Sequence, residues 1–464
     1  MSRAARAVSW ALSVAACAGF AAAAHAQPVP RSELLPPPPP AADAPGDALA
    51  KLLARTDAVA REVARVRGLP LKRPIPNEVV DRDELRRRLL VMAGEDKAKA
   101  ETAAEGLALA RWGMIPLATD YEALLIELLT EQIAGYYDPD TKKLTISKSA
   151  GDDAQWAELV LAHEIDHGLQ DQSFDLKKFE DLPDSEDDAR AARRALVEGD
   201  GVALMLEVML ARRGARVPWS SPQVTDAIEE AMVTPGNDDL DQAPLAIREA
   251  MIFPYRAGFT FVAALRRRQP WSAVDAAFAR PPRSTEQILH PERYLADDRP
   301  IPVALAAPPA LRGFAVAHET VWGELGFQLF LRGHGVDAST AAQAAAGWGG
   351  DRAIVLARDG DRRPVRAAGI SRSEWDSEAD AIEAEEAGVK ALDAAVTGAL
   401  VEQTPTRTRW FGIDGTVSWV ERRGPSIAIV MGAPAWAANA LAAEVWTASR
   451  IGPPPPAAKP APKL

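Results

Sequence analysis

The sequence contains one cysteine in 464 residues, Cys17, and this scarcity excludes several kinds of protein. A disulfide framework, a cysteine-based zinc knuckle and an iron–sulfur cluster all need several thiols in one chain. Basic residues are not in excess either, because 53 Lys and Arg stand against 65 Asp and Glu, for a formal net charge of −12. Phosphate contacts require clustered Lys and Arg, so we expect no nucleic-acid partner. A bound metal would have to use His and carboxylate ligands.

A long apolar run occurs at the N-terminus. Two arginines precede an apolar stretch over residues 7–24, and Ala24-His25-Ala26 has the small–x–small form of a cleavage site. This pattern predicts a signal peptide over residues 1–26. A second interpretation stays open, because residues 14–17 resemble a lipobox and acylation of Cys17 would anchor the protein to a membrane. Either route predicts export to the periplasm or the extracellular space, with no transmembrane span left after the signal is removed.

Proline-rich segments divide the rest of the chain. Residues 27–47 and 451–464 are rich in Pro and Ala, which predicts extended tethers with nothing to bury. Between them we predict a mainly helical α+β protein with two domains, a helical domain over 48–303 and a smaller α+β domain over 304–450.

Apolar periodicity and turn residues locate the expected elements. In the first domain they predict helices over 83–92, 97–111, 121–133, 154–172, 185–213 and 243–268, the last kinked or broken at Pro254, and a hairpin over 135–147. In the second domain they predict helices over 320–332, 377–400 and 435–449. The strands expected there cover 352–357, 364–369, 408–413, 416–422 and 426–431.

One segment has a pattern with a chemical meaning, His163-Glu164-Ile165-Asp166-His167, an HExxH sequence. Helical residues at i and i+4 lie about 40° apart, one turn above the other, so both imidazoles can point at one ion. Glu164 would lie at the adjacent edge, where it can reach a water molecule on that ion without being a ligand. The helix is apolar on both sides, and buried imidazoles are costly without a partner. The pattern therefore predicts a metal site.

A tetrahedral site with one open position needs a third protein ligand, which the residues directly after the motif do not supply. Glu198 is the best candidate, because it is an isolated carboxylate on an apolar stripe of the next long helix, where it needs a cation. A partly exposed Glu beside a glycine-rich turn is the alternative for this position. Asp171, Asp175 and Glu180 are weaker rivals, since the acidic loop is hydrated by solvent.

The order of these residues resembles the gluzincin group of zinc metallopeptidases, in which a Glu on a later helix follows HExxH. Further segments resemble secreted bacterial proteins of predicted metallopeptidase type: AGYYDP at 134–139, LAHEIDHGLQDQ at 161–172, LVEGD at 196–200, STEQILHPERY at 284–294 and GWGGDR at 347–352. The resemblance covers roughly residues 120–400. It implies a zincin-like core, one Zn²⁺ per chain on His163, His167 and Glu198, and Glu164 as the general base. Thermolysin-like enzymes place an Asp four residues after the ligand Glu, and Val202 stands there in this chain.

Together these features predict an exported zinc metallopeptidase with a peptide or protein substrate. Zinc would activate water and polarise the substrate carbonyl, and Glu164 would pass a proton from the water to the leaving amine. A zinc-stabilised envelope protein without peptidase activity, which uses residues 304–450 as its interaction surface, is the alternative.

Two residues of the proline-fixed segment, His290 and Tyr294, are catalytic candidates as donors to the developing oxyanion. The alternative is structural, with His290 capping a turn and Tyr294 packing on the surface. The hairpin over 135–147 could likewise pair with an extended peptide or be purely structural.

Overall fold

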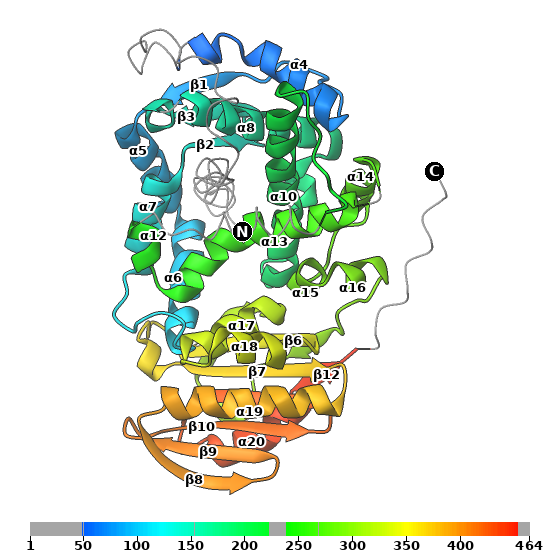
Figure 1. The fold of residues 1–464 in the computed structure, drawn as a ribbon. Helices are drawn as coiled ribbons and strands as arrows, with labels where there is room; N and C mark the ends of the chain where they lie inside the picture. The colour runs from blue at the N-terminus through cyan, green and yellow to red at the C-terminus, as the bar shows by residue number, and fades with distance from the viewer. Residues whose placement is uncertain (1–48, 50, 153, 222–237, 268, 453–464) are drawn as a thin grey trace.

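The computed structural model describes residues 49, 51–152, 154–221, 238–267 and 269–452 (Figure 1). They form a mainly helical α+β protein, which confirms the predicted fold class. The predicted signal peptide, the tether over 27–47 and all but the first two residues of the predicted tail lie outside the described residues. Within the described part, no helix is both long enough and apolar enough to cross a bilayer.

Two long helices of the N-terminal part, α8 (Ala154–Phe174) and α10 (Asp187–Arg212), pack against each other. The other helices there are α4 (Thr56–Arg67), α5 (Arg82–Ala93), α6 (Asp96–Arg111), α7 (Tyr121–Gln132), α9 (Leu176–Phe179), α12 (Asp238–Gln242), α13 (Leu245–Arg266), α14 (Ser272–Ala279), α15 (Thr285–Leu289) and α16 (Pro291–Leu295). Aspartates cap the starts of three of them, since Asp81 accepts a hydrogen bond from the Glu84 amide, Asp120 from the Ala123 amide and Asp175 from the Lys178 amide. The predicted helices agree with these bounds to within a few residues.

A three-stranded sheet packs against α8. It consists of β1 (Asn77–Val80), β2 (Gly135–Asp138) and β3 (Lys143–Ser147), in the order β1-β3-β2, followed by the 3₁₀ turn η2 (Lys148–Asp152). The pair β2–β3 is the predicted antiparallel hairpin, and β1 adds a parallel strand that the sequence pattern did not indicate. Strand β2 is an edge of this sheet.

The helices α10 and α13 cross with their backbones in contact. A Cβ atom at Gly199 would overlap the Gly258 backbone, and a Cβ at Gly258 would overlap the Ala195 carbonyl. Helix α13 runs unbroken through Pro254, so the break that was one of two predicted outcomes does not occur. The crossing holds the middle of α10 in one position relative to α13.

The C-terminal part is a seven-stranded antiparallel sheet covered by helices on both faces (Figure 1). Its strands are β5 (Phe314–Thr320), β6 (Trp348–Arg358), β7 (Ala368–Trp375), β8 (Gly398–Thr404), β9 (Arg407–Gly412), β10 (Thr416–Arg423) and β11 (Ser426–Pro434), in the order β5-β6-β7-β11-β10-β9-β8. The short strands β4 (Val303–Leu305) and β12 (Ser449–Ile451) pair separately.

Alternating residues of each central strand belong to different cores. In β6, Ala353 and Val355 pack toward α17 (Gly323–Gly333), α18 (Ala338–Ala345) and α19 (Glu378–Ala395), whereas Ile354 and Leu356 pack toward α20 (Ala438–Thr447). Burial on both faces explains why these strands read as apolar runs.

Three predictions in this part were wrong in detail. The helix predicted over 377–400 ends at Ala395, where β8 follows, and residues 364–366 form the 3₁₀ turn η4 before β7 begins. The strand predicted over 352–357 begins earlier, at Trp348, which is buried. Another 3₁₀ turn, η3 (Pro309–Leu311), precedes β5.

One hydrophobic cluster joins the two parts of the chain. It contains Trp112, directly after α6, together with residues of β6, β7 and α17–α19. The indole of Trp112 lies where a side chain at Gly369 would be, and the Trp112 carbonyl bonds His334 at 2.8 Å. Residues on both sides of the predicted boundary at 303/304 therefore share a core.

Polar contacts at the same junction surround a buried acid, Asp188 on α10. Its Oδ1 accepts hydrogen bonds from the amide and the hydroxyl of Thr285 at 3.0 and 2.5 Å. Burial raises the pKa of Asp188 to about 7; the Thr285 bonds oppose this, and the carboxylates of Asp351 and Glu324 reinforce it. Asp188 is thus more easily protonated in the folded protein than in the unfolded chain.

We expect Asp188 to make stability depend on pH in an unusual direction. Between pH 4 and 7 the folded state holds a proton that the unfolded state has lost, so stability falls as pH rises through this range. Relative to wild type, Asp188→Asn should gain stability from pH 5 to pH 8, by at most about 3 kcal/mol, since the two units between pH 5 and a pKa of about 7 count at about 1.4 kcal/mol each. Urea unfolding at both pH values measures this. The exposed control Asp359→Asn should leave the slope unchanged, and an equal slope in Asp188→Asn would contradict the prediction.

Candidate metal centre

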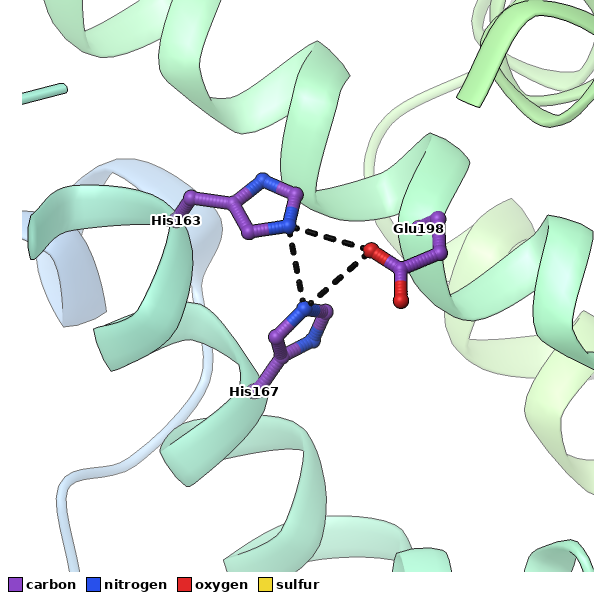
Figure 2. Close-up of side chains that lie close together, drawn as sticks. All are labelled: His163, His167 and Glu198. Carbon is purple, nitrogen blue, oxygen red and sulfur yellow. Dashed lines mark hydrogen bonds and ion pairs between the residues drawn. The ribbon is translucent and has the colours of Figure 1, made fainter. Parts of the chain in front are cut away.

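Three buried side chains from two helices meet at one point (Figure 2). His163 and His167 project from α8 and Glu198 from α10. The Nε2 atoms of the two histidines are 3.0 Å apart, and Glu198 Oε2 lies 3.1 Å from His163 Nε2 and 3.3 Å from His167 Nε2. Among the described residues this is the one group of three such side chains close enough to share an ion. The structure thus brings together all three predicted ligands.

The donor triangle has the dimensions of a metal site. Tetrahedral zinc with nitrogen and oxygen ligands at about 2.0–2.1 Å would separate them by about 3.3 Å. The three observed separations, 3.0, 3.1 and 3.3 Å, lie close to that value. Three lone-pair donors in a dry pocket repel one another unless a cation or a proton lies between them. The residues present therefore fit a divalent ion, and three protein ligands leave one tetrahedral position unfilled.

Glycine makes the approach of the two helices possible. A Cβ atom at Gly201 would come within 2.6 Å of the His163 ring, so only a glycine leaves the imidazole its place against α10. Gly199, on the opposite side, allows the contact with α13 described above. The segment Glu198-Gly199-Asp200-Gly201 thus combines a ligand with two close approaches, and its glycines do not loosen the helix, which continues to Arg212.

A chain of hydrogen bonds behind His167 holds its ring. His167 Nδ1 lies 2.9 Å from Gln170 Oε1, an acceptor, so Nδ1 carries the proton and Nε2 is free to face the ion. The Gln170 amide in turn donates to Asp166 at 3.0 Å and to Asp200 at 2.9 Å. Gln170 therefore orients the His167 ring.

The chain of hydrogen bonds behind His167 ends at Arg67, a buried arginine at the end of helix α4. Arg67 binds Asp200 through two bonds of 2.7 and 3.0 Å, lies 2.8 Å from Asp275, and stacks on the Trp271 ring at 4.3 Å. Burial disfavours the charged guanidinium, but the attraction of Asp200 and Asp166 outweighs it and raises the pKa of Arg67 above its usual range. The guanidinium therefore compensates the carboxylates behind the site.

Removing Gln170 should weaken metal binding without removing a ligand. We expect Gln170→Ala to lower zinc affinity by about 10–100-fold, the usual effect of losing the partner that orients a ligand histidine. Gln172→Ala is the matched control, because Gln172 lies on the same helix but bonds the backbone of Lys72 and Arg73. Competition with a chromophoric chelator measures both affinities, and equal values for the two variants would contradict the assignment.

Burial and neighbouring charges set the protonation of the triad. Burial favours a neutral Glu198, yet the attraction of His167 and hydrogen bonds from both histidines lower its pKa to about 2. Burial alone would lower the pKa of His167, but the attraction of Glu198 raises it to about 10. Burial and repulsion from His167 lower the pKa of His163. Without a metal the site therefore holds an imidazolium–carboxylate pair, and an incoming cation must displace that proton.

Glu164, the predicted general base, is buried beside the triad. Within the described part of the chain neither of its carboxyl oxygens has a partner at hydrogen-bond distance, and the main-chain amide of Tyr137 lies near them. Burial raises its pKa to about 8; the attraction of His167 opposes this and repulsion from Glu198 reinforces it. A buried carboxyl without a partner is costly, so its presence here needs a reason other than stability.

The other predicted residues lie elsewhere. His290 Nε2 is 3.1 Å from Glu324, and the Tyr294 hydroxyl donates to the Arg280 carbonyl at 2.9 Å. These contacts hold the short helices α15 and α16, and within the described residues none of them links either side chain to the triad. Tyr255 of α13, not singled out in the sequence, lies beside His163 instead, with ring centroids 6.3 Å apart.

The rival acids also have other contacts. Asp171 accepts a hydrogen bond from the Tyr137 hydroxyl at 2.8 Å and pairs with Lys142, and Asp175 caps the short helix α9. Glu180 is buried near Arg194 and Arg190. Glu198 is thus the acid that joins the two histidines.

Comparison with known proteins gives a match in the C-terminal part. Residues 312–442, from β5 into α20, match a domain of unknown function, DUF8575. The matched span contains the seven-stranded sheet and none of the triad residues. No curated protein and no solved structure matches the chain. The metal centre is therefore interpreted from its own geometry.

Proposed function

We propose that this protein is a zinc-dependent metallopeptidase of the gluzincin type, with a zincin-like core and with His163, His167 and Glu198 as the zinc ligands. The observation that carries the proposal is that a second buried carboxyl, Glu164, lies beside the triad. Three ligands leave a coordination position open, which is the pattern of catalytic rather than structural zinc sites. The buried carboxyl beside it has no side-chain partner among the described residues and a pKa near neutrality, as a general base requires.

The chain's own residues would divide the work as follows. A bound divalent ion would supply a Lewis acid that polarises a carbonyl and lowers the pKa of water. Glu164 would accept the proton of the attacking water on its carboxylate and later donate it to the leaving amine. Gln170 would keep the His167 Nδ1 proton in place, and Arg67 would hold the Asp200 carboxylate in position behind it.

The position of β2 supports a peptide as the substrate. This edge strand packs against α8, and the main-chain amide of Tyr137 lies near the Glu164 carboxyl. An extended peptide that paired with β2 would pass beside the helix that bears both histidines. We propose an exported location as well, on the basis of the N-terminal sequence pattern.

A second candidate function follows from the depth of the site. His163, Glu164 and His167 are fully buried and Glu198 is 1% exposed, so a substrate cannot reach them without movement of the surrounding chain. A metal at such depth suits a protein that zinc stabilises and whose C-terminal part binds a partner. This candidate predicts a zinc-dependent melting temperature and no hydrolysis.

A cleavage screen separates the two candidates. The zinc-loaded protein is incubated with a diverse peptide library, and products are identified by mass spectrometry with and without a chelator. We expect chelator-sensitive cleavage that returns when zinc is restored. A library that stays intact, with a melting temperature that falls on zinc removal, would favour the stabilised binding protein.

A further inference from the structure

A cavity lies where the two parts of the chain meet, not at the triad. This junction cavity has a volume of about 740 Å³ and is lined by residues of α6, α10, α13, β5 and α17 (Figure 1 shows the four helices). Its size is within the range of about 300–1,000 Å³ typical of ligand sites. Nothing in the proposed mechanism uses it.

The walls of the junction cavity are mainly apolar. Large side chains from both parts of the chain line it, including Trp112, Met114, Phe253, Trp322, Leu325 and Leu329. Trp112 and Trp322 meet edge to face with centroids 4.7 Å apart. An apolar wall of this extent favours a ligand with aliphatic or aromatic groups.

The charges around the cavity are mostly negative. Five acids line it, Glu101, Glu105, Asp184, Asp187 and Glu319, against two cations, Arg190 and Arg194. Both cations already interact with protein groups: Arg190 donates to the Glu180 and Pro183 carbonyls, and Arg194 attracts the Glu180 carboxylate. Protein cations also pair with four of the acids: Lys97 with Glu101 and Asp184, Arg190 with Asp187, and Arg352 with Glu319. Glu105 bonds the Tyr121 hydroxyl, and within the described residues no cation lies at ion-pair distance from it. The cavity therefore complements a positively charged group at Glu105.

One wall offers backbone groups to an extended chain. Strand β5 is an edge of the seven-stranded sheet, with β6 as its neighbour, and its residues 316–320 line the cavity. An edge strand exposes alternate N–H and C=O groups that another strand can pair with. On the opposite wall Pro254 has no N–H to donate to the Ala250 carbonyl, and both residues line the cavity.

The cavity approaches the metal centre along α10. Ala191 and Arg194 line it, and Glu198 lies four residues beyond Arg194, one helical turn or about 6 Å further along the same face. On α13, Pro254 lines the cavity and the next residue, Tyr255, lies beside His163. A chain held in the cavity would thus have one end near the triad.

We propose that the junction cavity binds an extended polypeptide segment with aliphatic or aromatic side chains and at least one Lys or Arg, which pairs as an added strand with β5. This inference deepens the proposed function, because it names the class of substrate segment, and it rests on that function only for the hydrolysis that would follow. The pairing itself needs no metal.

Binding can be tested with the full chain in its zinc-free form, so that hydrolysis does not interfere. The probe is a fluorescein-labelled twelve-residue peptide of alternating Val and Lys, followed by anisotropy and by hydrogen–deuterium exchange. We expect saturable binding, protection of the amides of β5, and at least about fivefold weaker binding to Glu105→Gln. Glu386→Gln, which removes an exposed acid on α19 remote from the cavity lining, should bind as wild type does.

Two altered probes separate the sources of affinity. A peptide with Glu in place of Lys tests the charge, and one with alternate N-methylated amides tests strand pairing at unchanged charge. Each should bind at least about tenfold more weakly than the parent. Binding of either at the parent's affinity, protection that omits β5, or no binding at all would overturn the inference. Binding to β5 without any cleavage by the zinc-loaded protein would overturn the proposed peptidase function and leave this inference standing.

Discussion

Glu164→Gln should bind zinc as tightly as wild type and lose hydrolysis by about 10³-fold or more. The amide has the same shape as the carboxyl, so the neighbouring ligands keep their positions. It cannot accept a proton from water, however, and general-base catalysis contributes typically 10²–10⁴-fold. Because Glu164 is buried with no hydrogen-bond partner in the described structure, the neutral amide also removes a costly buried acid. The variant should therefore be at least as stable as wild type.

Zinc content by atomic emission, peptide cleavage and thermal unfolding are measured on the same preparation. Glu158→Gln is the matched control, because it changes another acid of α8, which pairs with Arg212 and not with a residue of the triad. It should retain most of the hydrolysis that Glu164→Gln loses. Hydrolysis that survives Glu164→Gln would remove the proposed base and, with it, the mechanism.

Glu198→Gln should abolish stoichiometric zinc binding. Its carboxylate Oε2 closes the donor triangle with both histidines, and its charge compensates the ion. Loss of a direct ligand should lower affinity by more than about 100-fold, since even the outer partners of ligands contribute 10–100-fold. The stabilisation by bound zinc disappears as well, about 4 kcal/mol when free zinc exceeds the dissociation constant 1,000-fold.

Glu180→Gln is the matched control for this change. Glu180 was one of the weaker candidates for the third ligand. It is buried, and its carboxyl interacts electrostatically with Glu198 and His167. It should keep about one zinc per chain. Metal analysis after dialysis against buffered zinc compares the two variants. Normal zinc in Glu198→Gln together with low zinc in Glu180→Gln would reassign the third ligand.

The triad could be predicted because helical geometry determines most of it. The i, i+4 spacing of His163 and His167 places both rings on one face of any helix, whatever the tertiary structure. Glu198 followed from its isolation on an apolar stripe. Gln170 was within reach of the same reasoning, because it lies three residues after His167 and helical neighbours at that spacing can touch.

Other contacts depend on tertiary packing that periodicity does not contain. Arg67 and Asp200 are 133 residues apart, and nothing local to either indicates the pair. The edge strands β5 and β8 were missed because most of their residues are exposed or half-buried and show no clean alternation. The polar segment around His290 suggested chemistry, whereas the structure gives it contacts with α17 at the junction. Its predicted catalytic role stays a prediction.

The buried ion pair of Arg67 limits how the N-terminal region can be shortened. Arg67 is the last residue of α4, so a maturation protease that cut within that helix could release the guanidinium from Asp200. The acid would then be left uncompensated in an apolar interior two residues from a metal ligand, a loss of about 3–5 kcal/mol for a broken buried pair. Trimming up to the start of α4 leaves this pair in place, and trimming past its end removes it.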